Sequence, residues 1–178
     1  MPAYEVLAVF GDGLALCRDQ NDVVLVDVAR TLLQIWSSTT LVVSKPLMFP
    51  QSFSISPATE RFVDSHAELL ISCGLDIELV GPGTVMLREV PEELGSFDIK
   101  SFRNALEGIA ARAPSGQIEL LSLLAKAVWR EMPQYPLQRA AAVVRAIADR
   151  VNIQQLESQG IARRLDAASL RELLPPRG

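Results

Sequence analysis

Side chains capable of acid–base or nucleophilic chemistry are scarce in this sequence. His66 is the single histidine, and the two cysteines, Cys17 and Cys73, form no metal-binding spacing with it or with each other. A Ser-His-Asp or Cys-His mechanism needs a histidine beside its nucleophile, and a zinc site needs clustered histidine and cysteine ligands. We predict a hydrogen-bonded structural role for the histidine, core positions for both cysteines, and no metal or other cofactor.

Other chemical patterns are short or lie in turns. The glycine turns at 11–13 and 81–83 are too short for a phosphate-binding loop. The carboxylates of Glu92–Glu93 and those around Asp19–Asp22 fall in turn-like segments, where solvation is expected. The residues alone predict a non-catalytic interaction domain. An α+β enzyme or ligand-binding domain with an unrecognised site is the alternative.

The charge balance disfavours a general nucleic-acid binder. The net charge is -4 and the pI is about 5.1, whereas phosphate attraction needs clustered lysine and arginine. A local DNA contact is still open to the arginines near the C-terminal end, namely Arg145, Arg150, Arg163 and Arg164. The competing interpretation is that these arginines are solvated at helix ends.

The composition is that of one apolar, globular domain. A chain of 178 residues can bury a core without staples, either as one domain or as a domain with an inserted subdomain. Hydrophobic residues make up 49% and mean hydropathy is +0.22, so we expect a partner to cover some apolar surface. No run reaches the roughly 18 apolar residues of a membrane helix, and the start lacks a signal peptide. We therefore expect a cytoplasmic protein without membrane contact.

The elements that would position a site begin with a β-meander. Three β-prone runs, 4–10, 14–19 and 23–28, are separated by the turn-forming segments GDG and QND. Apolar residues at helical spacing then predict a helix over 28–36 that packs back on the sheet. Prolines keep 41–57 extended. The junction of the third run with its helix suits catalysis, yet few of its residues are polar.

The remaining chain predicts a mixed segment followed by helices. The expected elements are a helix from Ser56 and Pro57 to Cys73, a hairpin over 75–80 and 84–90, helices from Ser96 onward, a long helix from about 136 to 156, a strand at 162–165, and a short helix capped by Asp166. The predicted fold class is therefore α+β.

The front sheet is apolar on both faces, which is unusual for an antiparallel sheet. The 28–36 helix can cover one face. Either the C-terminal helices or a second subunit must cover the other, and we keep both alternatives. For a homodimer, the interface residues that we predict are Leu7, Val9, Val24 and Val26.

Three phrases in order resemble a known family: GDGLALCRDQNDVVLVDVARTLLQIW, KPLMFPQSFSIS and CGLDIELVGPGTVMLREVPEEL. The chain resembles the C-terminal dimerisation domain of the MutL DNA mismatch repair proteins. The resemblance implies a dimerisation subdomain of helices and antiparallel sheet formed by 1–45 and 136–178. It also implies an inserted α/β external subdomain at 46–135, and an ATPase in a separate N-terminal domain.

Many members of that family carry a metal-binding endonuclease motif, DQHAxxExxxxE, at the strand-to-helix junction. Its Asp falls on Asp27, but its His falls on Ala29 and its first Glu on Leu33, so no metal-binding set remains. The family's C-terminal zinc ligands also lack counterparts, since no Cys or His follows Cys73. The resemblance thus implies a branch without nuclease activity that works with MutS, a MutH-type endonuclease and a UvrD-type helicase.

The segment KPLMFP matches the place of the family's sliding-clamp motif. Lys45 stands where the motif has glutamine. The residues that would bind the clamp are Lys45, Leu47, Met48, Phe49 and Pro50, with the three apolar side chains as anchors. The alternative is that these side chains pack in the subdomain core.

Overall fold

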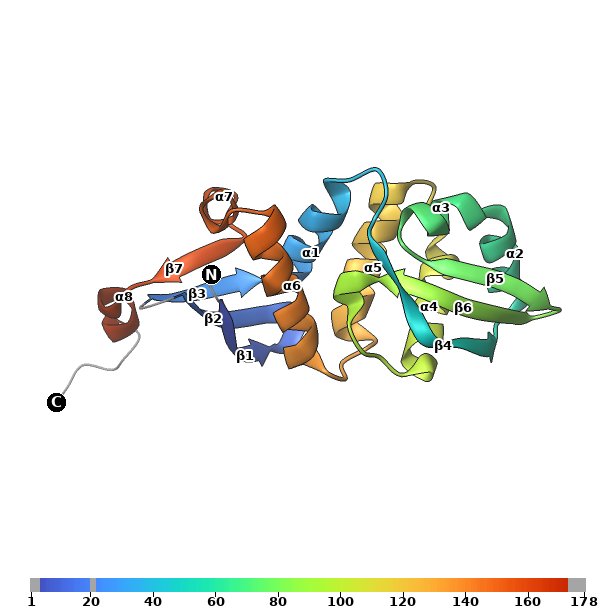
Figure 1. Ribbon diagram of the computed structural model, residues 1–178, viewed down its shortest axis with the longest axis horizontal. Coiled ribbons are helices and arrows are strands. Elements are labelled where there is room, and N and C mark those ends of the chain that lie inside the picture. The colour runs from blue at the N-terminus through green and yellow to red at the C-terminus, as the bar shows by residue number, and fades with distance from the viewer. Residues whose placement is uncertain (1–3, 20–21, 173–178) are drawn as a thin grey trace.

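The computed structural model describes residues 4–19 and 22–172 and confirms the α+β class, with two antiparallel sheets packed with helices (Figure 1). The strands are β1 (Glu5–Phe10), β2 (Leu14–Asp19), β3 (Asp22–Asp27), β4 (Ser44–Ser54), β5 (Asp76–Gly81), β6 (Thr84–Pro91) and β7 (Ala162–Leu165). The helices are α1 (Val28–Ser37), α2 (Pro57–Ser65), α3 (Ala67–Ser72), α4 (Ile99–Arg112), α5 (Gln117–Arg130), α6 (Pro136–Arg150), α7 (Ile153–Ser158) and α8 (Ala167–Glu172), with 3-10 turns η1 (Gly11–Gly13) and η2 (Glu92–Leu94).

The first sheet joins the N-terminal meander to a strand from the other end of the chain. Its order is β1-β2-β3-β7, and every neighbouring pair is antiparallel. The register places Ala15 opposite Val26, and Ala162 opposite Val26 on the other side. A β-strand alternates its side chains between faces, so these residues share one face.

A glycine lets a helix approach the first hairpin closely. Gly13 in η1 has φ +86, and a Cβ there would lie 3.0 Å from the ring of Trp129 in α5. Any larger residue would be strained by this backbone conformation and would press against the indole. The GDG turn therefore also serves as a packing surface.

The second sheet has the order β4-β6-β5 and lies at the opposite end of the molecule (Figure 1). Its long edge strand β4 is irregular. Pro46 pairs with Glu89, but the next residue in register, Gln51, pairs with Leu87, so residues 47–50 leave the ladder. Proline lacks the N–H that a ladder needs, which confines Pro46 and Pro50 to such an edge.

Two predicted helices are wrong in length. The helix expected from Ser56 to Cys73 is divided at His66 (φ -123, ψ 24) into α2 and α3. The helix expected to reach residue 156 ends at Arg150, because Val151 is extended and Asn152 starts a new helix. The Asn152 side chain accepts a hydrogen bond from the Gln154 backbone N–H at 2.9 Å, as an N-cap does.

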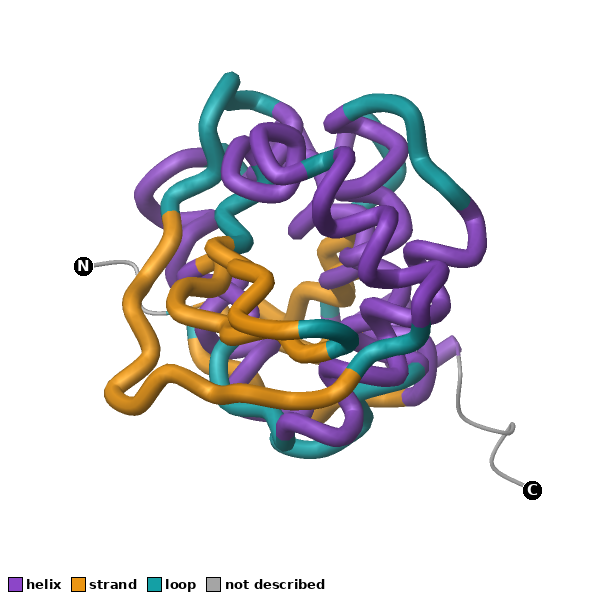
Figure 2. The backbone as a smooth tube through the Cα atoms, turned by 90° about the vertical axis from the view of Figure 1, so that its right-hand side faces the viewer, coloured by secondary structure: helices purple, strands orange, loops and turns teal. Residues whose placement is uncertain are grey.

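The helices cover the sheets unequally. Helices α1, α6, α7 and α8 contact the first sheet, the last two at its edge strand β7. Helices α2, α3 and α4 contact the second sheet, and α5 contacts α1, α4 and η1 between them. Seen from the second sheet, helices lie above and to the right of the strands (Figure 2). Buried side chains from both regions form one continuous core. Within the described ranges, no helix is both long and apolar enough to cross a bilayer.

Candidate functional site

The inner face of the first sheet is closed by the protein's own helices. Ala15, Cys17, Val24 and Val26 are at most 2% exposed and lie under α1 and α6. The prediction that Val24 and Val26 contact a second subunit is therefore corrected: both belong to the core of one protomer. Val9 pairs with Ala15, shares this face, and packs against the same core while half-buried.

The opposite face, called here the outer face, is apolar and open. Phe10 is 52% exposed, Leu7 44% and Leu14 39%. The remaining predicted interface residue, Leu7, lies at an irregularity of the edge strand, because the register shifts between Val6 and Ala8. The outer face consists of Leu7, Ala8, Phe10, Leu14, Leu16, Val23 and Leu25, the last two pairing with Arg18 and Leu16. The exposed side chains of this surface, Leu7, Phe10 and Leu14, are accessible to solvent or to a partner.

Charges border the outer face. Arg18 forms an ion pair with Glu5 across β1 and β2. Arg163 lies opposite Leu25 and is exposed, so it also borders this surface. An apolar centre with a charged border is the usual anatomy of a protein interface.

Asp27 caps a helix at the junction where the family motif would bind metal. Its carboxylate accepts a hydrogen bond from the Arg30 backbone N–H at 2.9 Å, and its carbonyl accepts one from Thr31 Oγ1 at 2.8 Å. Ala29 and Leu33 are half-buried on α1 and offer no ligand atoms. The Asp27 carboxylate therefore stabilises the start of α1.

Clustered metal ligands are not seen in the part of the chain that the structure describes. There, no group of three or more His, Cys, Asp or Glu side chains could hold an ion. Both cysteines are buried, and burial raises the pKa of each thiol to about 11. His66 Nδ1 lies 3.0 Å from the Phe62 carbonyl oxygen and its ring stacks on Phe62 at 4.6 Å. These positions confirm the structural roles predicted for the three residues.

The clamp segment, residues 45–50, protrudes from the second sheet. Met48 is 88% exposed and Phe49 71%, so the core alternative is wrong for these two side chains. Pro50 is exposed, Lys45 is half-buried, and Leu47 packs against the core while half-buried. A hollow of about 590 Å³ lies between this segment and residues 95–99.

The four arginines named as DNA contacts do not form one basic patch. Arg164 is held by Asp22 at 2.8 Å and Asp19 at 3.1 Å, and the hydrogen bond to Asp22 raises the pKa of Arg164. Arg150 is paired with Glu93 at 2.7 Å. Arg145 is exposed on α6 in a hollow that Glu92, Glu93 and Asp149 also line. Arg163 alone of the four lies on the border of the outer face.

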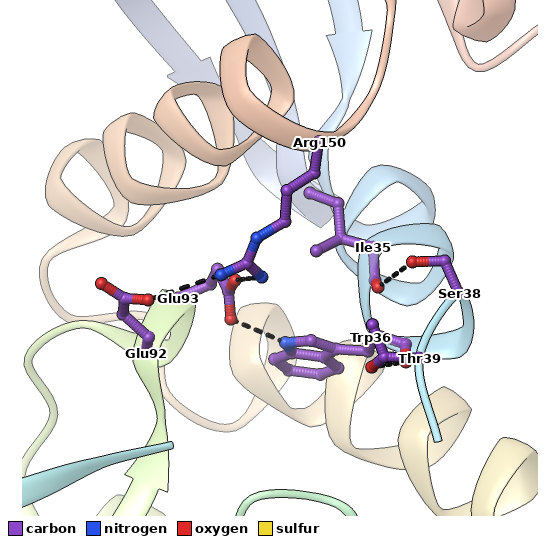
Figure 3. A network of polar contacts seen from close by, with 7 residues as sticks. All are labelled: Ile35, Trp36, Ser38, Thr39, Glu92, Glu93 and Arg150. Carbon is purple, nitrogen blue, oxygen red and sulfur yellow. Dashed lines mark hydrogen bonds and ion pairs between the residues drawn. The ribbon is translucent and has the colours of Figure 1, made fainter. Parts of the chain in front are cut away.

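A buried carboxylate joins the two halves of the molecule. Glu93 in η2 is 2% exposed, accepts a hydrogen bond from Trp36 Nε1 at 2.9 Å, and accepts one from Arg150 Nη1 at 2.7 Å. Figure 3 shows the side chains from α1 and α6 converging on it, with Glu92 farther out at 3.6 Å from Arg150. The prediction of solvated carboxylates at this position is therefore wrong for Glu93.

A buried arginine makes a second connection. Arg139 in α6 is 0% exposed and donates to the backbone carbonyls of Leu94 at 3.2 Å and Ser96 at 2.8 Å, and also to that of Met132. Burial lowers the pKa of this guanidinium. Carbonyl acceptors satisfy it without a carboxylate. It fixes α6 to the segment that follows the second sheet.

The sequence profile described as "MutL C terminal dimerisation domain" matches residues 7–135, which is more than half of the chain. The chain belongs to this family. Membership in a family of dimerisation domains implies a homodimer. Residues 7–135 include β2, β3 and all of β1 except Glu5 and Val6. They therefore contain the seven outer-face residues named above, together with the clamp segment and the second sheet.

Curated MutL proteins share part of the domain. DNA mismatch repair protein MutL of Phenylobacterium zucineum is 39% identical over 57 residues, 32% of this chain and 9% of that protein. The MutL of Carboxydothermus hydrogenoformans is 36% identical over 64 residues, covering 36% and 11%. The MutL of Caulobacter vibrioides is 39% identical over 57 residues, covering 32% and 9%. The match thus spans about a tenth of each curated relative, and the chain is a C-terminal dimerisation domain of a mismatch repair protein.

Proposed function

We propose that two copies of this MutL C-terminal domain pair through the outer face of the first sheet. The observation that carries the proposal is the exposure of the large apolar side chains of Phe10, Leu7 and Leu14 on the outer face. An isologous contact needs one self-complementary patch, and an apolar sheet face can supply it. An ordinary interface buries about 800 Å² per partner, which favours association by several kcal/mol after its costs.

The subdomain division follows from the same arrangement. We propose that residues 1–45 and 136–178 form the dimerisation subdomain and that 46–135 form an external subdomain. In support, the first sheet takes its strands from Glu5–Asp27 and Ala162–Leu165, whereas the second takes its strands from within Ser44–Pro91. Glu93 and Arg139 then hold the two subdomains together.

The dimer would keep two ATPase arms in one molecule. In this proposal each chain carries an N-terminal ATPase domain, and joining the C-terminal domains raises the effective concentration of one arm for the other, to roughly millimolar for a flexible linker. The whole protein would then serve as a docking platform for MutS, a MutH-type endonuclease and a UvrD-type helicase. The domain contributes the connection rather than the chemistry.

The domain belongs, we propose, to the branch without nuclease activity. Asp27 acts as a helix cap, and Ala29 and Leu33 stand where the motif requires an imidazole and a carboxylate. A metal ion needs several converging donors to activate water. A nicking assay with Mn²⁺ on supercoiled DNA tests this proposal: we expect no nicked product, and metal-dependent nicking would reassign the domain as an enzyme.

The clamp segment is proposed as a binding site for the sliding clamp. Met48 and Phe49 are exposed apolar anchors on a protruding edge, which suits an extended peptide entering a pocket. Replacing both with alanine should weaken clamp binding at least tenfold, measured by surface plasmon resonance, because each truncation of an anchor costs more than about 1 kcal/mol. Unchanged binding would remove this assignment. Ile71→Ala, an exposed apolar residue on α3, is the matched control.

Sedimentation equilibrium tests the dimer itself. At micromolar concentration the domain should sediment with twice its formula mass of 19.5 kDa. A monomer at that concentration contradicts the proposed pairing through the outer face.

A further inference from the structure

Helices α4 and α5 enclose a hollow with a basic border. Its volume is about 220 Å³, and Arg112, Lys126 and Arg130 line it. Ile109 and Ala127, both largely buried, form part of its apolar base. The three cationic side chains come from exposed positions on two consecutive helices, so the packing of α4 against α5 brings them to one hollow.

These three cations form no ion pair within residues 4–19 and 22–172. No carboxylate oxygen of that part lies within 4.0 Å of their side-chain nitrogens, whereas Arg150 and Arg164 each have carboxylate partners. The chain as a whole carries a net charge of -4, so a local group of three cations is opposite in sign to the overall charge. Cations near helix C-termini stabilise the helix dipole, which accounts for Arg112 and Arg130 but not for Lys126 one turn earlier.

One carboxylate shares the hollow. Glu131 lines it, and a Cβ added at Gly108 would lie 3.5 Å from both carboxylate oxygens. A Cβ at Gly108 would thus be in ordinary van der Waals contact with this carboxylate. Because it carries the opposite charge, Glu131 should oppose an anionic ligand that the three cations attract.

We propose that this hollow contacts the phosphate backbone of double-stranded DNA. Arginine can bind a phosphate through two parallel hydrogen bonds, and lysine adds a point charge, so the set suits phosphate oxygens. A small-molecule site would bury most of its ligand, whereas these cations lie on exposed helix surfaces. This DNA contact is separate from the proposed dimerisation. It does not involve Arg150 or Arg164, which already form ion pairs with carboxylates.

The salt dependence of DNA binding tests the inference. Affinity of the whole domain for a short fluorescein-labelled duplex is measured by anisotropy over a series of salt concentrations. The double variant Lys126→Ala/Arg130→Ala should bind more weakly and lower the slope of log K against log salt by about 2, since each phosphate contact contributes about 1. The matched double variant Arg61→Ala/Lys100→Ala removes two exposed cations elsewhere and should leave the slope unchanged.

A second variant should act in the opposite direction. Glu131→Gln removes the opposing charge and should strengthen DNA binding at low salt. Glu68→Gln, an exposed carboxylate on α3, is its control and should change affinity less. Thermal unfolding checks that each variant is folded. All four variants leave the outer face intact, so their oligomeric state in sedimentation should be unchanged, and this test is therefore independent of the proposed dimer.

Three results would overturn the inference. The first is an equal loss of slope in both double variants, which would indicate a diffuse charge effect. The second is an equal gain in affinity for Glu131→Gln and Glu68→Gln. The third is calorimetric binding of inorganic pyrophosphate that depends on Lys126 and Arg130 while DNA binding does not, which would assign the hollow to a free phosphate compound.

Discussion

The outward faces of the two sheets of this domain differ in polarity. The second sheet presents polar groups outward, including the exposed Glu78–Arg88 ion pair at 2.6 Å, while Val85 and Leu87 are fully buried on its inner side. The first sheet also buries its inner side, yet its outer face presents Phe10 and Leu14. A sheet face that contacts water can be polar. A face that contacts another protein keeps apolar residues.

The difference supports the two roles that we propose for the two sheets. The second sheet needs only its own helices, so its surface is free to carry a protruding edge such as the clamp segment. The first sheet exposes apolar area on its outer face, and this is the surface through which we propose that two copies pair. In the proposed function, dimer assembly and clamp binding would thus use different sheets, which lie at opposite ends of the molecule (Figure 1).

The largest expected effect comes from the covered face of the first sheet. Val24→Asp places a carboxylate without a partner at a position that is 0% exposed, and should lower the free energy of unfolding by more than about 4 kcal/mol. Urea unfolding measures the change. Its control is Leu25→Asp on the same strand, which points to the outer face and should leave the protomer folded. Equal loss of stability in the two variants would show that the two faces do not differ.

The next effect tests the connection between the sheets. Glu93→Ala leaves Arg150 and the Trp36 indole without their acceptor, and should lower the free energy of unfolding by about 3 kcal/mol. Glu92→Ala removes the more distant and exposed neighbour and should cost less than about 0.5 kcal/mol. Chemical denaturation of the two variants measures both changes. A decrease below about 1 kcal/mol in the free energy of unfolding for Glu93→Ala would mean that the buried contact contributes little.

The smallest effect belongs to the polar outer side of the second sheet. Replacing Glu78 with alanine breaks an exposed ion pair with Arg88 and should cost about 0.5 kcal/mol or less. Because this side faces solvent, the oligomeric state should not change. A shift toward monomer in sedimentation would contradict the assignment of assembly to the first sheet alone.

Much of the fold follows from local patterns in the sequence. The meander, the helix after Asp27, the hairpin and the late strand at 162–165 depend on turn residues and periodicity, and the structure contains them all. The break at Asn152 also had a local signal, because asparagine is a frequent N-cap. The division at His66 had a weaker one.

The face of a strand was harder to predict. When both faces are apolar, alternation shows that two groups exist but not which of them the helices cover, and this is why Val24 and Val26 were assigned to the wrong side. The irregularity at Leu7 depends on pairing with β2 and changes the side on which Val9 lies. Register is a property of two strands, so one strand's sequence does not determine it.

Long-range polar contacts were missed for a related reason. Glu93 meets Trp36 and Arg150, each 57 positions away in the chain, and nothing beside it marks it as buried. The only available signal is that buried indole and guanidinium groups need acceptors. Exposure of Met48 and Phe49 likewise depended on the departure of residues 47–50 from the ladder.

The dissociation constant of the dimer, measured by sedimentation equilibrium for two matched variants, tests the central claim most directly. Leu14→Asp on the outer face of the first sheet should weaken the dimer by at least about a hundredfold, because it places an unpaired charge in an apolar contact. Val80→Asp, at a similarly exposed apolar position of the second sheet, should leave the dimer intact. A dimer that survives the first change, or dissociates with the second, would contradict assembly through the first sheet.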